Sequence, residues 1–289
     1  MGRVIFVTAF KGGVGKTTVT AGIACALSAL GKRVCIVDAD FGMRCMDMVL
    51  GMSDYAMYDC SDVLNGSCTA ADALLPIGDF DCMWFLPAPI RYDGSTPDRA
   101  RAAELIAYLK ERFDYCILDS SAELTPYYRV FADLCDEAIV VTLHQSVAIR
   151  AAEKTAAHLS SFGYRRVHLV VNNFSEKKAK SGKLPTLYEI ICRSSVPLLG
   201  AVPHSEALPE DQEEAYLTMT GGEKDRPKDY EVAFLNIACR LCGLETPLCK
   251  GMHHIKRKGT LLAERGKALH KQRKNAERWS EAGKEGTFA

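Results

Sequence analysis

The segment from Phe10 to Thr18, FKGGVGKTT, constrains the fold of this chain more than any other. It follows the apolar run VIFVTA and precedes VTAGIACALSAL, so a buried strand leads into a Gly-rich loop and the loop opens a helix. Backbone N–H groups and a helix N-terminus then converge on an anion, as in a phosphate-binding loop. The standard form, G-x-x-x-x-G-K-[ST], has glycine where Phe10 stands, and an additional lysine, Lys11, comes next.

The residue types in the loop suit a bound phosphate chain. Glycines allow positive φ and close approach of the backbone to a ligand. Lys16 is expected to bind the β- and γ-phosphates, and the hydroxyl of Thr17 is expected to coordinate Mg²⁺. The expected nucleotide contacts are Gly12, Gly13, Val14, Gly15, Lys16, Thr17 and Thr18.

Carboxylates follow two other apolar runs. Asp119 closes the run YCIL, and Asp38 and Asp40 stand in VDAD. A Mg-nucleotide site needs a carboxylate at the end of a strand beside the loop, and Asp119 meets that need. Alternation along an extended segment points Asp38 and Asp40 the same way, which suits one to the metal shell and the other to a water near the γ-phosphate. A lone strand-end Asp is about as often a helix cap.

Short β-branched runs alternate with longer helical patterns along the chain, which predicts a doubly wound, mainly parallel α/β sheet of the P-loop NTPase type. We expect strands at Arg3–Thr8, Arg33–Val37, Cys82–Leu86, Tyr115–Leu118, Glu137–Thr142, Arg166–Val171 and Pro197–Val202. We expect helices at Lys16–Leu30, Pro97–Arg112, Pro126–Cys135, Ser146–Phe162, Pro185–Ser194 and Asp229–Cys242.

Charge is distributed unevenly along the chain. The formal net charge is zero, yet residues 250–289 hold eleven Lys or Arg and four Glu, a net +7. We therefore expect an ATPase domain over 1–246 and a basic, flexible tail over 247–289. With no secretory leader pattern at the start, the expected location is the cytoplasm, where the twelve cysteines stay reduced.

Several segments together resemble the MinD/ParA family of deviant Walker P-loop ATPases, and most of all its MinD branch. The most specific are KGGVGKTT and VDADFGMRCMDMVLGM; the others, in the family's order, are FDYCILDS, DEAIVVT, VVNN and PLLGAVP. The resemblance runs from about residue 3 to about residue 244 and implies the SIMIBI-type fold. It also implies a dimeric, ATP-gated spatial switch in placing the cell-division site, with a protein activator.

The resemblance assigns roles to individual residues. Lys11 corresponds to the lysine that reaches across a nucleotide-sandwich homodimer to the partner's phosphates. Asp40 corresponds to the residue that positions the attacking water, while Asp38, Asp119 and Thr17 serve Mg²⁺.

The resemblance also implies which nucleotide binds. Asn172 and the turn at Val202 and Pro203 correspond to segments that flank adenine. The sequence has no N-K-x-D guanine reader, so ATP is the expected nucleotide.

Two features depart from the family. The family usually reads D-S-P-A-G after the carboxylate strand, whereas this chain has Ser121 and Glu123 in place of Pro and Gly. A glutamate there restricts the backbone and adds negative charge near the γ-phosphate, so hydrolysis is expected to be slow. The tail is basic enough to attract anionic lipid, but its apolar face is thin, so we expect a solvated extension, with ATP-dependent peripheral membrane binding as the alternative.

Three other functions stay open from the sequence. Cys239 and Cys242 lie at i and i+3 of a predicted helix, with Cys249 beyond, and thiolates so placed suit an iron–sulfur or metal carrier of the same class. The basic tail also permits a ParA-type DNA-partitioning ATPase. The third alternative is a nucleotide-gated scaffold without turnover.

Overall fold

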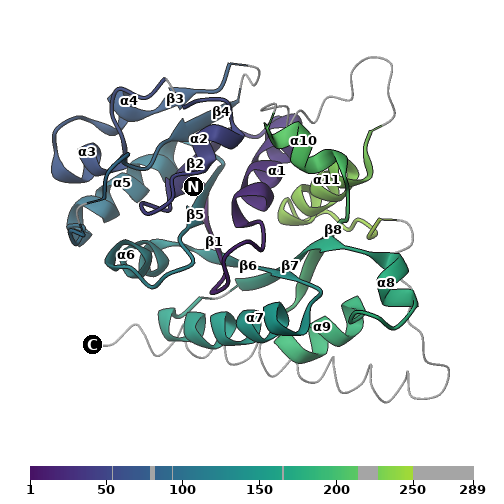
Figure 1. Ribbon diagram of the computed structural model, residues 1–289. Coiled ribbons are helices and arrows are strands. Elements are labelled where there is room, and N and C mark those ends of the chain that lie inside the picture. Colours follow the sequence, from purple (N-terminus) through teal and green to yellow (C-terminus); the bar gives the residue numbers. More distant parts are fainter. Residues whose placement is uncertain (54, 79–81, 93, 165, 214–226, 250–289) are drawn as a thin grey trace.

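The computed structural model describes residues 1–53, 55–78, 82–92, 94–164, 166–213 and 227–249, drawn as coloured ribbon in Figure 1. Most of the predicted tail, 247–289, lies outside these residues, and so does the membrane contact expected of it. The division of the chain at residue 246 therefore stays a prediction.

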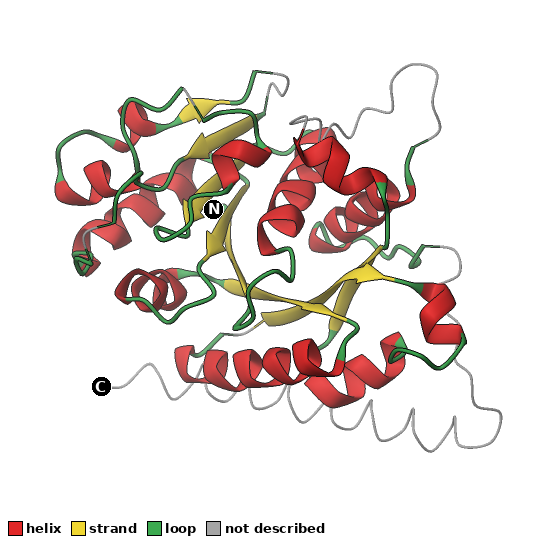
Figure 2. Ribbon diagram, in the orientation of Figure 1, coloured by secondary structure: helices red, strands yellow, loops and turns green. Residues whose placement is uncertain are grey.

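One eight-stranded sheet, yellow in Figure 2, forms the centre of the molecule. Its strand order is β3-β4-β2-β5-β1-β6-β7-β8. Every neighbouring pair is parallel except β3 with β4. The predicted doubly wound, mainly parallel α/β fold is confirmed. The strands are β1 Arg3–Thr8, β2 Val34–Ala39, β3 Leu75–Pro76, β4 Met83–Leu86, β5 Tyr115–Ser120, β6 Glu137–Leu143, β7 Arg166–Phe174 and β8 Leu198–Pro203.

Helices cover both faces of this sheet (Figure 1). One face carries α1 Lys16–Ala29 and α11 Asp229–Leu241, and the other carries α5 Arg99–Arg112, α6 Pro126–Leu134, α7 Ser146–Leu159 and α9 Leu187–Ser194. Shorter helices are α2 Met46–Val49, α3 Cys60–Asn65, α4 Ala70–Ala73, α8 Glu176–Lys180, α10 Ala207–Glu213 and the 3₁₀ turn Ser160–Phe162. No helix among the described residues combines the length and apolar character needed to cross a membrane.

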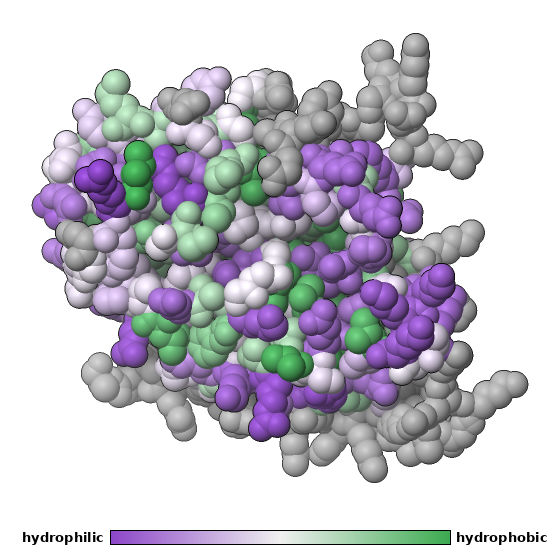
Figure 3. Space-filling model, in the orientation of Figure 1, coloured by the Kyte–Doolittle hydropathy of each residue, from purple (hydrophilic) through white to green (hydrophobic). Residues whose placement is uncertain are grey.

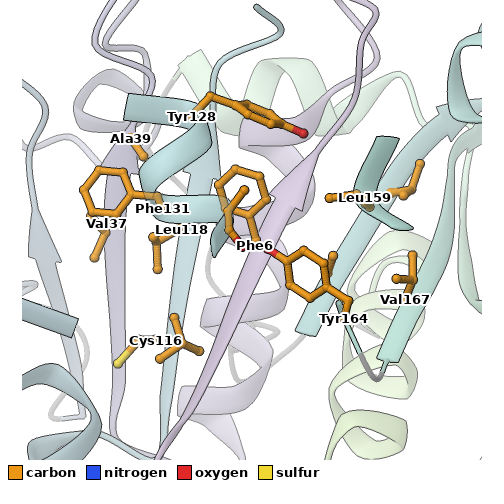
Figure 4. Packing of buried hydrophobic residues seen from close by; sticks show 14 of the residues in the cluster. Phe6, Val37, Ala39, Cys116, Leu118, Tyr128, Phe131, Leu159, Tyr164 and Val167 are labelled. Carbon is orange, nitrogen blue, oxygen red and sulfur yellow. Dashed lines mark hydrogen bonds between the residues drawn. The ribbon is translucent and has the colours of Figure 1, made fainter. Parts of the chain in front are cut away.

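Two hydrophobic cores result, one on each face. Alternation along β1 sends Phe6 to the core under α5, α6 and α7 (Figure 4) and Ile5 to the core under α1 and α11. In the second core Gly22 of α1 meets Phe234 of α11, and a Cβ at Gly22 would lie 2.5 Å from that ring. The close approach of these helices fixes α1, and with it the loop that precedes it.

Several strands run further than predicted. Strand β2 continues past Val37 to Ala39, and β6 and β8 each end one residue later than expected. Strand β5 continues past Leu118 through Ser120, because Asp119 and Ser120 pair with Asp38 and Ala39 of β2. Strand β7 continues past the predicted end at Val171 to Phe174. Asp38 and Asp119 are therefore inside β2 and β5, paired in the sheet, whereas Asp40 follows the end of β2.

Arg3 and Glu137 form an ion pair between β1 and β6. The guanidinium donates to both carboxylate oxygens at 2.6 Å, and the exposed fractions of the Arg3 and Glu137 side chains are 27% and 6%. Burial acts to raise the pKa of Glu137, but contacts with His168 and Arg3 outweigh burial and lower that pKa to about 2. Since an unfolded glutamate titrates near about 4.3, this pair stabilises the fold fully above that pH and loses its effect as the pH falls toward 2.

Glu137→Ala is expected to lower the free energy of unfolding at neutral pH by about 3 kcal/mol, because it leaves the Arg3 guanidinium largely buried without its carboxylate. Urea unfolding would measure the loss, and the gap from wild type should narrow as the pH drops from 5 toward 2. Arg33→Ala is the control, since Arg33 pairs with Asp114 at 3.3 Å on an exposed surface and should contribute less than about 1 kcal/mol. Equal losses in the two variants would contradict the prediction.

Candidate functional site

The loop between β1 and α1 has the backbone of an anion cradle. Gly13 and Gly15 take positive φ values of 70° and 84°. Helix α1 begins at Lys16 with no side chain capping it, so the N–H groups of its first turn can bind a ligand. The predicted phosphate contacts lie in this loop and in the first turn of α1: Gly12, Gly13, Val14, Gly15, Lys16, Thr17 and Thr18.

Asn172, expected beside adenine, braces the loop itself. Its amide donates from Nδ2 to the backbone oxygen of Val14 at 3.0 Å, and a Cβ at Gly15 would lie 2.2 Å from the same nitrogen. Glycine is therefore required at position 15 for its φ and for space. The bracing contact crosses 158 positions of sequence, and no local pattern indicates it; the adenine contact stays a prediction.

Asp38 and Asp119 stand opposite each other in the register of β2 and β5. Thr17 donates its hydroxyl to Asp119 Oδ2 at 2.7 Å, and Thr20 donates to Oδ1 at 3.2 Å. Asp38 Oδ1 accepts from the backbone N–H of Asp40 at 3.0 Å. The three predicted metal-binding residues are therefore gathered at the carboxyl edge of the sheet, beside the loop.

Burial raises the pKa values of both strand carboxylates. Asp38 is 0% exposed and Asp119 is 1% exposed. Burial, and then the charge of Asp119, hold the pKa of Asp38 well above its usual range. Burial also raises the pKa of Asp119, to about 6, against the opposing effects of the Thr17 hydrogen bond and the Lys16 charge. Two buried carboxylates of like charge favour a bound cation, which would lie between the carboxylates on one side and a ligand on the other.

The donor set fits Mg²⁺ better than a metal held by protein alone. Among the described residues, no group of three His, Cys, Asp or Glu side chains is close enough to hold a metal. Magnesium is ordinarily bound through one or two carboxylates together with waters and substrate phosphates. The oxygens of Thr17, Asp38 and Asp119 fit that pattern.

Asp40 lies just past the end of β2, half buried, and starts a turn. Its Oδ1 accepts from the N–H of Met43 at 3.3 Å, and its backbone oxygen accepts from the N–H of Arg44 at 2.9 Å. Arg44 has a φ of 44° and pairs with Asp47 at 2.7 Å. Asp40 is thus held at the edge of the site, and its role toward water stays a prediction.

The two lysines of the loop differ in surroundings. Lys16 is 9% exposed and near enough to Asp119 to lower the pKa of that carboxyl. Lys11 is half exposed, and within the part of the chain that the structure describes no carboxylate pairs with it. Its ammonium is therefore free to meet a group from outside this subunit.

The segment after Asp119 forms a tight turn. The Ser121 hydroxyl donates to the backbone oxygen of Glu123 at 2.6 Å, and the Glu123 side chain is exposed. Glu123 is not among the non-glycine residues with positive φ, so the expected backbone restriction causes no strain here. Thr125 then caps α6 by accepting from the N–H of Tyr128.

Helix α10 closes the other side of the loop, a feature that the sequence did not predict. Gln212 donates from Nε2 to the Thr18 hydroxyl at 2.9 Å. The helix follows Pro203, the last residue of β8, and His204, whose Nδ1 lies 2.7 Å from Asn173 Oδ1. Pro203 pairs with Phe174 of β7, two residues beyond Asn172, and its place beside adenine stays a prediction.

The helical cysteines lie far from this site. The Tyr115 hydroxyl donates to Cys242 Sγ at 3.6 Å, and Tyr115 begins β5 at the amino edge of the sheet. None of the twelve cysteines, all of which lie within the described residues, forms a disulfide. Cys239 and Cys242 are therefore at the edge opposite the loop, where they would not share a site with nucleotide.

A parallel sheet whose first strand ends in a glycine and lysine loop, beside paired strand-end carboxylates, defines a P-loop nucleotide-binding domain. A family model for the CobQ/CobB/MinD/ParA nucleotide binding domain matches residues 5–217. The septum site-determining protein MinD of Bacillus subtilis is 34% identical over 253 residues, 86% of this chain and 92% of that protein. MinD of Thermotoga maritima is 32% identical over 253 residues, 86% and 91% of the two chains.

Solved structures agree. The MinC:MinD cell division protein complex of Aquifex aeolicus has a TM-score of 0.77 and 29% identity, covering 89% of this chain and 100% of that chain. MinD of Pyrococcus horikoshii complexed with Mg-ADP has a TM-score of 0.73 and 26% identity, covering 83% and 96%. The chain belongs to the MinD/ParA family of P-loop ATPases, in its septum site-determining MinD branch.

Proposed function

We propose that this protein is a Mg-dependent ATPase that works as an ATP-gated dimeric switch in placing the cell-division site. The observation that carries the proposal is the hydrogen bond from Thr17 to Asp119, which sets the loop of Lys11 and Lys16 against the buried carboxylates. The Pyrococcus horikoshii relative is complexed with Mg-ADP, which supports binding of an adenine nucleotide and Mg²⁺ here.

The residues of the site have distinct tasks in hydrolysis. The loop amides and Lys16 bind and orient the phosphates. Thr17 and Asp119, with Asp38 behind them, would hold Mg²⁺, which when bound neutralises charge on the phosphate oxygens. Asp40 orients water toward the γ-phosphate.

Dimerisation makes the switch. A lysine supplied by a second subunit neutralises phosphate charge only when two nucleotide-loaded subunits meet, so ATP and dimer formation become one equilibrium. Large apolar side chains stand exposed among charged ones (Figure 3) in segments that follow the carboxyl ends of β2, β4, β5 and β6, which suits this edge to a partner surface. They are Met43, Met48, Met57, Ile90, Leu124 and Val147.

A protein partner and activator also belong to the proposal. The Aquifex aeolicus neighbour is a MinC:MinD complex, which supports a protein partner for this chain. Partition proteins among the solved structures, such as the one from Borrelia burgdorferi at 15% identity, share the fold alone and give no support for DNA partitioning.

Phosphate release from ATP tests the proposal. Asp40→Ala is expected to lower the rate at least about a hundredfold, the low end of the range for a positioned acid–base group, and EDTA should stop wild-type release. Asp72→Ala, which changes an exposed carboxylate in α4, is the control and should keep the wild-type rate. Full activity in Asp40→Ala would remove Asp40 from the mechanism.

We also propose that ATP turnover is slow because of Ser121 and Glu123. A wild-type rate above about 1 s⁻¹, the low end for enzymes, would contradict this proposal.

We further propose a cytoplasmic protein that meets the inner face of the cell membrane through its basic tail, 247–289. Attraction of about 1 kcal/mol for each Lys or Arg near an anionic surface supports this. In a flotation assay with anionic vesicles and Mg-ATP, the full chain should float with the vesicles. A protein that lacks 250–289 should stay in the unbound fraction. Equal recovery of both proteins would contradict a role for the tail.

A further inference from the structure

Phe10 stands where the standard loop has its first glycine, and its backbone is tied to a distant helix. The N–H of Phe10 donates to Thr155 Oγ1 in α7 at 3.1 Å. Thr155 is 0% exposed, and its hydroxyl donates in turn to the Ala151 backbone oxygen at 2.9 Å. The buried hydroxyl thus uses its proton within the helix and offers a lone pair to the loop.

The ring of Phe10 makes a second attachment. Its centroid lies 5.2 Å from that of His158 in α7 and 6.1 Å from that of Tyr128 in α6. The Thr8 hydroxyl donates to the Tyr128 hydroxyl at 3.1 Å, and Tyr128 packs edge-on against Phe6 (Figure 4). The chain is therefore fastened to α6 and α7 immediately before the phosphate loop.

We propose that Phe10 and Thr155 are positioning residues for Lys11, an inference that rests on the dimeric switch proposed above. Lys11 follows Phe10 directly, so its Cα lies about 3.8 Å from an anchored Cα, whereas Gly12 and Gly13 beyond it are exposed. A glycine at position 10 would have no ring to pack and a freer backbone. The contacts of Phe10 with Thr155, His158 and Tyr128, together called the anchor, hold the start of the loop in one arrangement. Less conformational entropy is therefore lost when Lys11 meets the partner's phosphates.

Phe10 also contacts α6, the helix that follows the turn of Ser121 and Glu123 beside the site. Helix α6, which carries Tyr128, begins directly after the turn of Ser121 and Glu123. Phe10 therefore contacts the helix into which the Asp119 strand leads, and α7 through Thr155. Loosening Phe10 should free the start of the loop while leaving Gly15, Lys16 and Thr17 held by α1 and Asn172.

Hydrogen exchange on the nucleotide-free protein tests the anchor without reference to dimers. Thr155→Val keeps the shape of the side chain and removes the acceptor, so exchange of the Phe10 amide should quicken roughly fivefold to tenfold. Thr155→Ser keeps the hydroxyl and should leave that exchange near wild type. Unchanged exchange in Thr155→Val would overturn the anchor.

Dimer formation with Mg-ATP tests the positioning role. Thr155→Val and Phe10→Ala should each raise the protein concentration for half-dimerisation roughly fivefold to tenfold, while the Kd for ADP stays within about twofold of wild type. Phe162→Leu is the matched control, since Phe162 contacts His158 and has no ring contact with Phe10; it should dimerise as wild type.

The outcomes separate this inference from the proposed function. Normal dimerisation of both variants, alongside loss in Lys11→Ala, would overturn the positioning role and leave the switch standing. An equal loss of ADP binding would overturn it too, because the anchor would then serve the whole loop. Absence of any ATP-dependent dimer in the wild-type protein would overturn the switch and the positioning role together, while the exchange result still decides the anchor.

Discussion

Lys16→Ala is expected to weaken ATP binding about a hundredfold. Lys16 is 9% exposed beside the loop, and losing one partner of a buried charge pair costs about 3 kcal/mol or more, which is about a hundredfold in Kd. Titration calorimetry with ATP in the presence of Mg²⁺ would measure it.

A control variant separates the effect of the Lys16 charge on ATP binding from the effect of the protein's overall positive charge. Lys32→Ala removes a lysine just after α1, at the edge of the sheet opposite the loop, and should leave the Kd unchanged. The unfolding midpoint of Lys16→Ala should also be followed, because Lys16 offsets the buried charge of Asp119. ATP affinity within about threefold of wild type, about 0.65 kcal/mol, would count against a phosphate role for Lys16.

Lys11→Ala is expected to leave ATP binding by the monomer nearly intact and to abolish the ATP-dependent dimer. The Lys11 ammonium has no carboxylate partner within the described part of its own subunit, so its loss removes little there. Across the interface it removes a charge pair worth about 3 kcal/mol, or about a hundredfold in the dimerisation constant. Sedimentation velocity at micromolar protein would measure the change, in an Asp40→Ala background that preserves ATP.

Lys177→Ala is the matched control for that experiment. Lys177 is an exposed lysine of α8, away from the loop, and its removal changes net charge equally. Dimerisation of Lys11→Ala at wild-type concentrations would contradict the role in trans. A loss of ATP binding as large as the loss of dimer would instead place Lys11 among the contacts of its own subunit.

The strands and long helices could be predicted because their signals are local. Continuous apolar runs such as Arg3–Thr8 and Tyr115–Leu118 are typical of strands buried on both faces, and they occur where expected. Helices of four to seven residues, such as Met46–Val49 and Ala207–Glu213, are too short to show a helical period. Helix α2 has no side-chain cap and is held by its packing against α1 and α10, whereas capping boxes begin the short helices α3 and α4.

The sequence indicates the residue types of the candidate site but not the contacts that hold them in place. The sequence places Asp38 and Asp119 at strand ends, yet their opposition depends on the register of β2 against β5, which no single segment encodes. The contacts of Asn172 with Val14 and of Gln212 with Thr18 join positions more than 150 residues apart. Side chains that support a loop from a distance leave no periodic trace in the sequence.

The molar mass of the Asp40→Ala protein, measured by light scattering with ADP and then with Mg-ATP, tests the central claim most directly. The substitution is chosen to stop hydrolysis from removing the complex. The ATP-gated switch predicts the mass of one chain, 31.7 kDa, with ADP and twice that mass with Mg-ATP. A single-chain mass under both conditions would contradict the switch and favour a nucleotide-binding scaffold that does not dimerise.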